Sequence, residues 1–209
     1  MLKAGVARIL SVGCYRLPHG AHVTRYSMYK VLSDSCQDGS HGRGKPVLVI
    51  SGSEQLASLV GFDQASLVNV EYPEYNILDL HHLDGGQYDA VVSDQVLEHV
   101  EGDPQQAFNE SLRLLKPGGL AVHATCFINP IHGAPSDFWR FTPEALKWLA
   151  RDFSEILYAG GWGNRRIWVL DWLGLRFKPI PHARWHPLHN FAVANNELWP
   201  VVTWVIARK

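Results

Sequence analysis

Small and acidic residues follow the buried strands that this sequence predicts, and their types suit the binding of a polar ligand. Residues 46–50 (PVLVI) form a continuous apolar run, typical of a parallel strand buried on both faces, and Ser51-Gly52-Ser53 follow directly. Glu71 ends the next expected strand, residues 67–70, and lies 19 residues beyond Gly52. An acid at about this spacing binds ribose hydroxyls in nucleotide-binding α/β folds. Because the carboxyl ends of parallel strands meet at one edge of the sheet, the polar residues after later strands join the same candidate site: Asp79, Ser93, Asp94 and Gln95.

A second group of candidate residues lies in the loop at 129–141 (NPIHGAPSDFWRF). His132 can be neutral at physiological pH and accept a proton, with Asp137 as a second candidate base. Trp139 offers an aromatic face to a sugar or a cation, and Arg140 offers a guanidinium to a phosphate or carboxylate. The alternative is that the aromatic side chains pin the loop to the core while Arg140 pairs locally.

The elements that must position these residues alternate between short apolar strands and helices, which favours an α/β architecture with a parallel sheet covered on both faces. Thr142 and Pro143 have the residue types of an N-cap and a first helical position. Besides the two strands already given, strands are expected at 76–79, 88–92, 120–127, 154–158 and 201–206. Helices are expected at 54–60, 104–115 and 143–149, and within 1–36 with an interruption near 17–20; residues 37–45 are expected to form a loop.

Composition places the chain among folded globular proteins. It has 209 residues, 46% of them hydrophobic and 19% charged, and a formal net charge of −1, so no nucleic-acid partner is expected. Its three cysteines are too few and too scattered for a disulfide framework. No metal site is expected at His182, His186 and His189, because Pro187 interrupts a helix there and no cysteine or acid completes a ligand set. Without a signal peptide or an apolar run of about 18 residues, a cytoplasmic protein is expected.

The wording YDAVVSDQVLEHV…LLKPGGLAVHA between Tyr88 and Ala124 resembles the class I S-adenosylmethionine-dependent methyltransferases. The resemblance implies a Rossmann-like, mostly parallel sheet of seven strands with the last strand antiparallel and helices on both faces. It also implies S-adenosyl-L-methionine as the cofactor and a glycine-rich loop after the first strand, where this chain keeps Gly52 between Ser51 and Ser53.

The same resemblance assigns roles to the polar residues around that edge of the sheet. It implies that Glu71 binds the ribose, that Tyr72 packs on the adenine, and that Asp79 with the backbone amide of Leu80 binds the adenine amino group. Ser93, Asp94 and Gln95 are then expected to face the sulfonium end of the cofactor. Glu98 and His99 are interpreted as part of the shared scaffold, since function depends on the pocket more than on the motif.

Residues 132–144 (HGAPSDFWRFTPE) resemble a subset of these methyltransferases that often accompanies glycan biosynthesis. This resemblance implies methyl transfer to an oxygen of a small-molecule acceptor, a sugar or glycan intermediate, with His132 as the leading base and Asp137 second. Trp139 and Arg140 are then candidate acceptor-binding residues. Two alternatives stay open: an N- or C-methyltransferase of a natural-product pathway, and an inactive methyltransferase fold that acts as a binding or scaffolding protein.

The expected organisation is one domain with an unusual insertion. Residues 1–45 are interpreted as a helical cap and loop, 46–159 as the cofactor-binding core, 160–200 as a tryptophan-rich insertion, and 201–209 as the last strand. The insertion holds five tryptophans among arginines and lysines. Core packing, a lid over the site, a homodimer face and peripheral contact with a membrane surface are all compatible with that composition.

Overall fold

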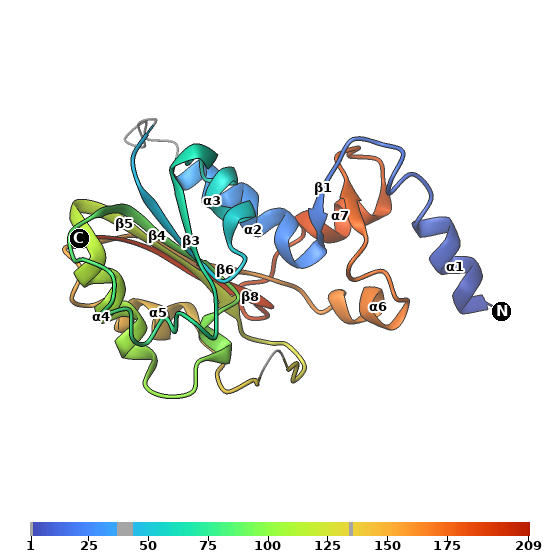
Figure 1. Cartoon of the computed structure of the whole chain (residues 1–209). Helices are drawn as coiled ribbons and strands as arrows, with labels where there is room; N and C mark the ends of the chain where they lie inside the picture. Colours follow the sequence, from blue (N-terminus) through green and yellow to red (C-terminus); the bar gives the residue numbers. More distant parts are fainter. Residues whose placement is uncertain (1, 37–43, 134–135) are drawn as a thin grey trace.

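The computed structural model of the chain describes residues 2–36, 44–133 and 136–209, and its centre is a six-stranded sheet (Figure 1). The strand order is β3-β2-β4-β5-β8-β6. The first four strands are parallel, while β8 runs antiparallel to both β5 and β6. The expectation of a Rossmann-like α/β sheet with an antiparallel last strand is therefore confirmed. The strands are β2 (Val47–Ile50), β3 (Leu67–Val70), β4 (Tyr88–Asp94), β5 (Leu115–Cys126), β6 (Glu155–Trp162) and β8 (Val202–Arg208).

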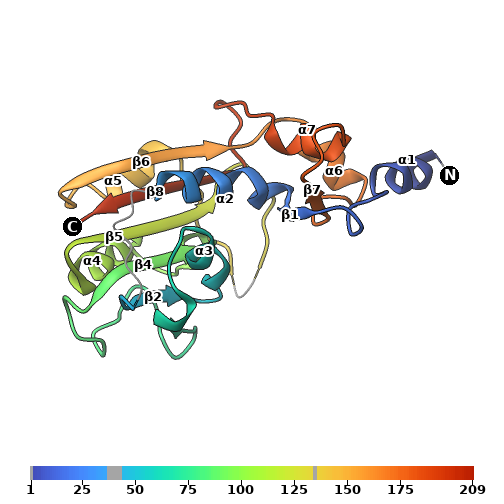
Figure 2. The ribbon, with the colours of Figure 1, turned by 90° about the horizontal axis from the view of Figure 1, so that it is seen from above.

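Helices cover both faces of the sheet (Figure 2). Val47 and Val49 belong to a core shared with α2 (Val23–Ser35) and α3 (Glu54–Leu59). Leu48 and Ile50 belong to the opposite core, shared with α4 (Pro104–Leu114) and α5 (Pro143–Leu149). Successive side chains of a strand point to opposite faces of the sheet. Because helices cover both faces of β2, all of its side chains are buried, which explains its unbroken apolar run.

Side-chain caps start the two helices on the second face. The Asp103 carboxylate accepts a hydrogen bond from Gln105 N at 2.9 Å, and Pro104 opens α4. The Thr142 hydroxyl accepts from Ala145 N at 3.1 Å, and Pro143 opens α5, as the sequence predicted. Each cap satisfies a backbone N–H that the first helical turn leaves without a partner.

The strand expected at 76–79 is not formed, so the central sheet has six strands rather than seven in the described part of the chain. Asn76 and Asp79 make only an isolated bridge. The Asn76 side chain accepts from Leu78 N at 3.0 Å, and Asp79 N donates to Asn76 O at 2.8 Å. Asn and Asp stabilise such turns through their own backbone, and here that local bonding replaces the ladder of a strand.

The segments before and after the core form a lobe at one end of the sheet. Residues 2–22 hold α1 (Leu2–Leu10) and β1 (His19–His22), and this short strand begins within the interruption expected near residues 17–20. Residues 163–200 hold α6 (Ile167–Trp172), β7 (Pro179–Pro181) and α7 (Pro187–Val193). Pro187 begins α7 instead of interrupting a helix, with His186 as its N-cap. Of the loop expected at 37–45, only Gly44 and Lys45 lie within the described residues.

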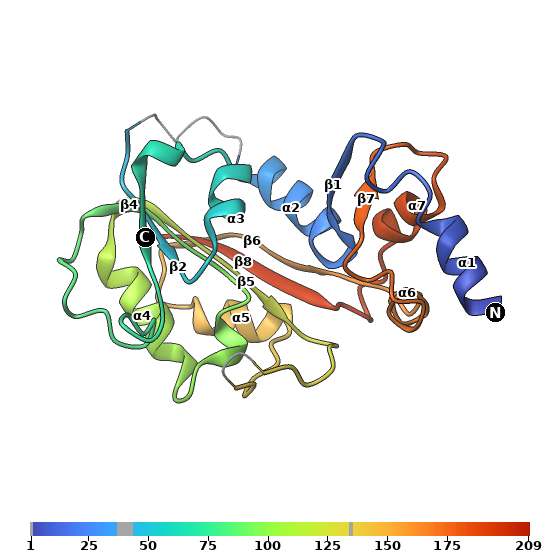
Figure 3. The same cartoon turned by 45° about the vertical axis from the view of Figure 1, so that its right-hand side comes forward.

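Antiparallel pairing of β1 with β7 joins these two segments, which are far apart in sequence. We call residues 2–22 and 163–200 the outer lobe. Figures 1 and 3 show α1, β1, α6 and α7 together beyond the sheet, and Figure 2 shows β5 and β6 pointing toward them. Across the residues that the structure describes, no helix is both long enough and apolar enough to span a membrane. Two short 3-10 helices, Gln64–Ser66 and Leu97–His99, complete the fold.

His123 ties β5 to its neighbours inside the core. It is fully buried, and its Nδ1 and Nε2 lie 2.7 Å from Ser93 Oγ and 3.1 Å from Ser111 Oγ. Ser111 Oγ already donates its hydrogen to Ala107 O at 2.8 Å, so it accepts from His123 Nε2–H. The Nδ1 atom is then the acceptor for Ser93, and the neutral ring is fully hydrogen-bonded.

The buried His123 makes the stability of the protein pH-dependent. Burial lowers the pKa of His123 to about 4, so between that value and about 6.5 the unfolded chain binds a proton that the folded chain does not. The contribution of His123 to the free energy of unfolding is complete above about pH 6.5. It decreases as the pH falls, by about 2 kcal/mol between about pH 7 and about pH 5. Urea unfolding at both pH values measures this loss. His123→Asn is expected to be less stable but to lack this part of the pH dependence. If the free energy of unfolding of the variant changed between the two pH values as much as that of the unaltered protein, the assignment to His123 would be contradicted.

Candidate active site

The loop after β2 has the backbone shape that close approach to a ligand needs. Ser51 has φ of 45° and Gly52 has φ of 74°. Left-handed backbone at a residue with a Cβ is strained, and Ser51 is held there by its N–H to Val70 O at 2.8 Å and by Tyr72 N to its hydroxyl at 3.4 Å. A Cβ placed on Gly52 would meet no heavy atom within 4 Å, so this face of the loop is open.

Ser53 stabilises the loop through two hydrogen bonds of its hydroxyl group. Its hydroxyl donates to Ile50 O at 2.5 Å and accepts from Asp94 N at 2.8 Å, and the residue is buried. These two bonds connect the end of β2 to the end of β4. The serine at this position therefore holds the loop in place, and its hydroxyl is already occupied.

Glu71 and Tyr72 lie where β3 ends, beside the open face of this loop. Glu71 Oε1 accepts the Gly52 N–H at 3.0 Å, which fixes the carboxylate against the loop. Both residues, with Ser51 and Gln95, line a cavity of about 620 Å³. That volume is within the range of small-molecule pockets. Four of the expected cofactor residues are thus brought together by the fold.

Asp79 and Leu80 are placed outside this cavity. The Asp79 carboxylate binds His81 Nδ1 at 2.5 Å on the surface, and Leu80 N donates to Glu110 Oε2 at 2.9 Å. The amide expected to reach an adenine already has a protein partner. Asn76 and Ile77 line the cavity at the corresponding end instead.

Ser93 and Asp94 are also engaged by the protein. Ser93 is buried against His123, as described above. Asp94 Oδ2 accepts from Arg25 Nε at 3.0 Å and from the Tyr29 hydroxyl at 2.6 Å, both on α2. Burial and the Asp94 carboxylate raise the pKa of Tyr29, so its hydroxyl stays a donor. Asp94 thus anchors α2 to the end of β4.

Gln95 and His99 stand at the junction of two cavities. Gln95 has φ of 59°, and its Nε2 is buried without a hydrogen-bond partner among the described atoms. Both residues line the cavity of about 620 Å³ and also a second cavity of about 300 Å³. A strained backbone and an unsatisfied amide together mark Gln95 as a candidate ligand contact.

The second cavity lies between the sheet edge, α2 and the outer lobe. His132 lines it together with Cys126 and Asn129 from the sheet side. The other side carries basic and aromatic residues: His22, Arg25, Arg176 and Phe177. Arg176 Nε is buried without a partner among the described atoms, while its other guanidinium nitrogens lie beside Asn129 Oδ1 and Asp171 Oδ1. Burial, with Arg25 and Arg176 nearby, lowers the pKa of His22 to about 4, so His22 is neutral at physiological pH.

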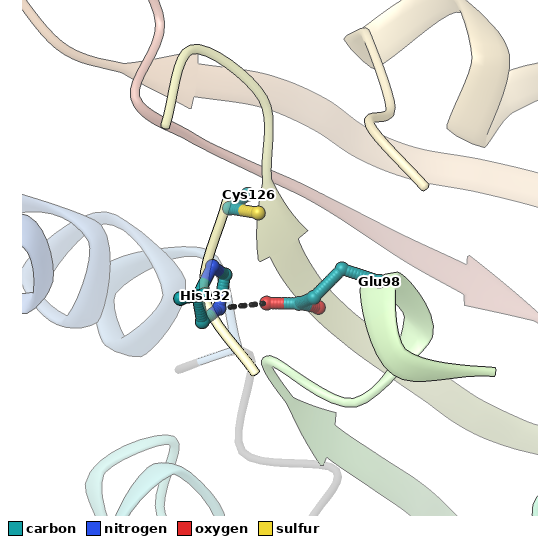
Figure 4. Close-up of side chains that lie close together, drawn as sticks. All are labelled: Glu98, Cys126 and His132. Carbon is teal, nitrogen blue, oxygen red and sulfur yellow. Dashed lines mark ion pairs between the residues drawn. The ribbon is translucent and has the colours of Figure 1, made fainter. Parts of the chain in front are cut away.

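Glu98, Cys126 and His132 come together beside this cavity (Figure 4). Their ligand-type atoms lie within 4.8 Å of one another, and His132 Nε2 is 4.0 Å from Glu98 Oε1. Glu98 Oε2 accepts from Thr125 Oγ1 at 2.8 Å, while Oε1 has no partner among the described atoms. Such a set of three groups could hold a metal ion only with the Cys126 thiol deprotonated, and burial opposes that by raising the pKa of the thiol.

Burial dominates the electrostatics of this cluster. Desolvation raises the pKa of Glu98, which is fully buried. Burial and the Glu98 carboxylate raise the pKa of Cys126 to about 12, so its thiol stays protonated. Because burial favours the neutral form of Glu98, this carboxyl group gives little compensation to a cation on His132.

Asp137 holds His132 in position. Its Oδ2 accepts the His132 backbone N–H at 2.8 Å and lies 3.3 Å from His132 Nδ1, which is also 3.2 Å from Pro130 O. Two acceptors at Nδ1 favour the tautomer with its hydrogen there, despite the Asn129 amide nitrogen at 3.1 Å, and leave the Nε2 lone pair free. Hydrogen bonding to Arg140 lowers the pKa of Asp137, so it stays ionised.

Arg140 and Trp139 organise the loop rather than line either cavity. Arg140 donates to both Asp137 oxygens and to the carbonyl groups of Asn129, Pro130 and Trp139. Trp139 Nε1 donates to Val100 O at 3.0 Å. These contacts fit the alternative of local pairing that the sequence also allowed, and the acceptor-binding roles of Trp139 and Arg140 stay predictions.

Several cavity residues were not among those expected from the sequence. Glu98 and His99 were interpreted as scaffold, yet His99 lines both cavities. His22 and Arg25 come from the N-terminal segment, and Arg176 comes from the insertion. The LEHV wording was a usable signal for the first two, whereas nothing in the local sequence marks the other three.

Comparison with known proteins finds similarity to methyltransferases. The sequence profile of a methyltransferase domain family matches residues 39–123. A ubiquinone biosynthesis O-methyltransferase of Acinetobacter baylyi is 32% identical over 108 residues, which cover 48% of this chain and 45% of that protein. A second, from Acinetobacter baumannii, is 29% identical over 169 residues, which cover 75% of this chain and 70% of that protein. The first alignment thus spans less than half the length of the relative.

A solved structure supports the same identification at the level of the fold. The SAM-dependent methyltransferase of Archaeoglobus fulgidus has a TM-score of 0.51 and 12% identity, and the superposition covers 89% of this chain and 96% of that chain. At this identity the likeness concerns the fold alone. S-adenosyl-L-methionine is the methyl donor of the matched family. The chain is therefore similar in sequence to a methyltransferase domain over residues 39–123, and its fold is like that of a SAM-dependent methyltransferase.

Proposed function

We propose that the protein transfers the methyl group of S-adenosyl-L-methionine to an oxygen of a small molecule held in the cavity of about 300 Å³. The observation that carries the proposal is the junction of the two cavities at Gln95 and His99. A donor in the larger cavity and an acceptor in the smaller one would meet there. Holding both reactants in line across such a junction supplies much of the rate of a displacement reaction.

The residues of the larger cavity suit the donor. Glu71 would bind the ribose hydroxyls, Tyr72 is half exposed beside it, and the open face of Gly52 leaves room for close approach. When bound, S-adenosyl-L-methionine supplies an electrophilic methyl group on a cationic sulfur. The unpartnered amide of Gln95 lies where it can contact either ligand.

His132 would remove the proton from the acceptor hydroxyl. Its Nε2 lone pair is free, and Asp137 and Pro130 hold the ring through Nδ1. Proton removal as the oxygen attacks turns a weak nucleophile into a strong one. The positive charge that forms on His132 would be stabilised by the ionised Asp137 at 3.3 Å. In this reading Asp137 is a positioning residue and not the base.

The class of acceptor is a further part of the proposal. Two relatives are named as O-methyltransferases of ubiquinone biosynthesis, which supports oxygen as the methylated atom. The wording of residues 132–144 instead suggests a sugar hydroxyl, for which the comparisons offer no support. Arg25 and Arg176 in the cavity favour an acceptor that carries a hydrogen-bond-accepting or anionic group in either case.

A methyl-transfer assay tests the proposal. The protein is incubated with S-adenosyl-L-methionine carrying an isotopically labelled methyl group and with phenols, sugar derivatives and amines, each with and without a carboxylate or phosphate. We expect label on an oxygen of an acceptor from the first two classes. Transfer only to amines, or to carbon, would move the assignment to an N- or C-methyltransferase. Binding of S-adenosylhomocysteine with no transfer to any class would favour the scaffolding alternative.

A further inference from the structure

Charge is separated between the outer lobe and the rest of the chain. Residues 2–22 and 163–200 carry eight Lys or Arg residues against only two acids, Asp171 and Glu197. The other residues carry eleven Lys or Arg and eighteen Asp or Glu. A chain of net charge −1 therefore has a strongly basic end beyond the sheet (Figure 3). Such a distribution orients a protein in the field of a negatively charged surface.

The same lobe exposes large aromatic side chains. Trp172 is 61% exposed, Tyr15 66%, and Phe177 and Trp185 are each 72% exposed. Ile9 of α1 is likewise 72% exposed, so the helix presents apolar surface away from its contacts with the lobe. Exposed apolar groups gathered on one part of a surface indicate a contact with something outside the molecule.

Basic and aromatic side chains are interleaved on this surface. Lys3 Nζ lies 4.9 Å from the ring centroid of Trp172, which places α1 beside α6. Lys178 Nζ lies 5.2 Å from the ring centroid of Tyr15, which places the residue before β7 beside the segment after α1. His186, the neighbour of Trp185, bonds Val12 O at 2.9 Å. The exposed residues therefore lie on adjoining elements of the outer lobe.

We propose that the outer lobe docks on an anionic lipid surface. Tryptophan and tyrosine settle at the level of lipid headgroups, where one end of the ring is apolar and the other polar. Lysine and arginine beside them are attracted to negatively charged headgroups. No described helix spans a membrane, so the contact is of the interfacial kind, in which side chains enter only the headgroup boundary.

The charge of the lobe argues against a second copy of this chain as the occupant. A two-fold symmetric dimer brings the same patch of both copies together. Here that arrangement would set eight basic residues and two acids against an identical set. Like charges across an interface repel, whereas an anionic bilayer neutralises them.

Docking would bring the smaller cavity close to the lipid. Arg176 and Phe177 line that cavity and also belong to the outer lobe. This consequence rests on the proposed function, because it treats the cavity as the acceptor site. The docking itself does not depend on the proposed function. An acceptor with an apolar tail in the bilayer would then reach the site without leaving the lipid.

Vesicle co-sedimentation of the full chain tests the proposal. The probes are vesicles of phosphatidylcholine alone and of phosphatidylcholine with phosphatidylglycerol. We expect binding only to the second, and its loss when NaCl rises from about 0.05 M to about 0.5 M, because salt screens the attraction. The variant Trp172→Ala/Trp185→Ala is expected to lower the partition coefficient by about tenfold or more, because both rings leave the interface.

Trp148 provides the matched control. It is 69% exposed on α5, outside the outer lobe, and Arg151 lies 4.9 Å from its ring centroid. Trp148→Ala therefore removes a similar cation–aromatic pair and is expected to leave binding unchanged. Equal binding to both vesicle types, or equal losses in the two variants, would overturn the proposal. A concentration-dependent dimer that only the Trp172→Ala/Trp185→Ala variant abolishes would assign the surface to a second copy instead.

Discussion

Replacing His132 with alanine is expected to lower kcat for methyl transfer to oxygen by about 10²- to 10⁴-fold, the range that a positioned general base contributes. The reason is geometric. Asp137 and Pro130 lie 3.3 and 3.2 Å from Nδ1, which leaves Nε2 as the proton acceptor beside the smaller cavity. Because the ring lines that cavity and not the larger one, the affinity for S-adenosylhomocysteine should stay within about twofold of the original. Single-turnover rates and calorimetric titration measure the two quantities separately.

Two other histidines make this prediction specific. His82 is exposed and lines neither cavity, so His82→Ala should leave kcat unchanged. His99 lines both cavities and is the rival base. Near-normal turnover in His132→Ala with a large loss in His99→Ala would transfer the role to His99. Normal turnover in both variants would show that the acceptor needs no base, as expected for an amine.

Replacing Glu71 with alanine is expected to weaken the binding of S-adenosylhomocysteine by about 10- to 100-fold, because hydrogen bonds to a carboxylate contribute about 1.5–3 kcal/mol each. Two effects combine in this variant. The ribose loses its acceptor, and the Gly52 N–H loses the Glu71 Oε1 atom 3.0 Å away that holds the loop against the cavity. Calorimetric titration of the purified protein measures the change.

Glu74 is the matched control for this second prediction. It is an exposed acid in the same connection after β3, but it does not line the cavity of about 620 Å³. Glu74→Ala changes the net charge by the same amount and should bind the ligand normally. Equal weakening in both variants would mean that Glu71 acts through general electrostatics. If the unaltered protein does not bind S-adenosylhomocysteine at all, the assignment of this cavity is wrong.

The local sequence was sufficient to predict a strand or a helix start wherever neighbouring residues supply the interactions that stabilise it. The apolar run of β2 predicted a strand buried on both faces, and Thr142-Pro143 predicted the start of α5, because caps and strand burial depend on a few adjacent residues. The same reasoning failed at 76–79. There the apolar Ile77 and Leu78 suggested a strand. Instead, the Asn76 side chain accepts a hydrogen bond from the backbone of Leu78 and stabilises a turn.

The candidate site was predictable only in part. The sequence predicted cofactor contacts at Ser51, Glu71, Tyr72 and Gln95, because each follows a strand whose carboxyl end lies at the ligand edge, and these four residues line one cavity. It could not tell which polar groups the protein itself would occupy. Leu80 N is bound by Glu110, and the Arg140 guanidinium is bound by Asp137 and nearby carbonyl groups, so neither is free for a ligand.

By itself, the sequence determined the alternation of strands and helices, the edge of the sheet at which a ligand would bind, and the kind of cofactor that its wording resembles. The tertiary structure decided which distant residues share a space. Glu98, Cys126 and His132 meet because β5 and the segments after β4 and β5 converge, and the N-terminal segment reaches the site because β1 pairs with β7. Periodicity and capping act over a few residues, whereas these contacts depend on how whole elements pack. No local pattern encodes that packing.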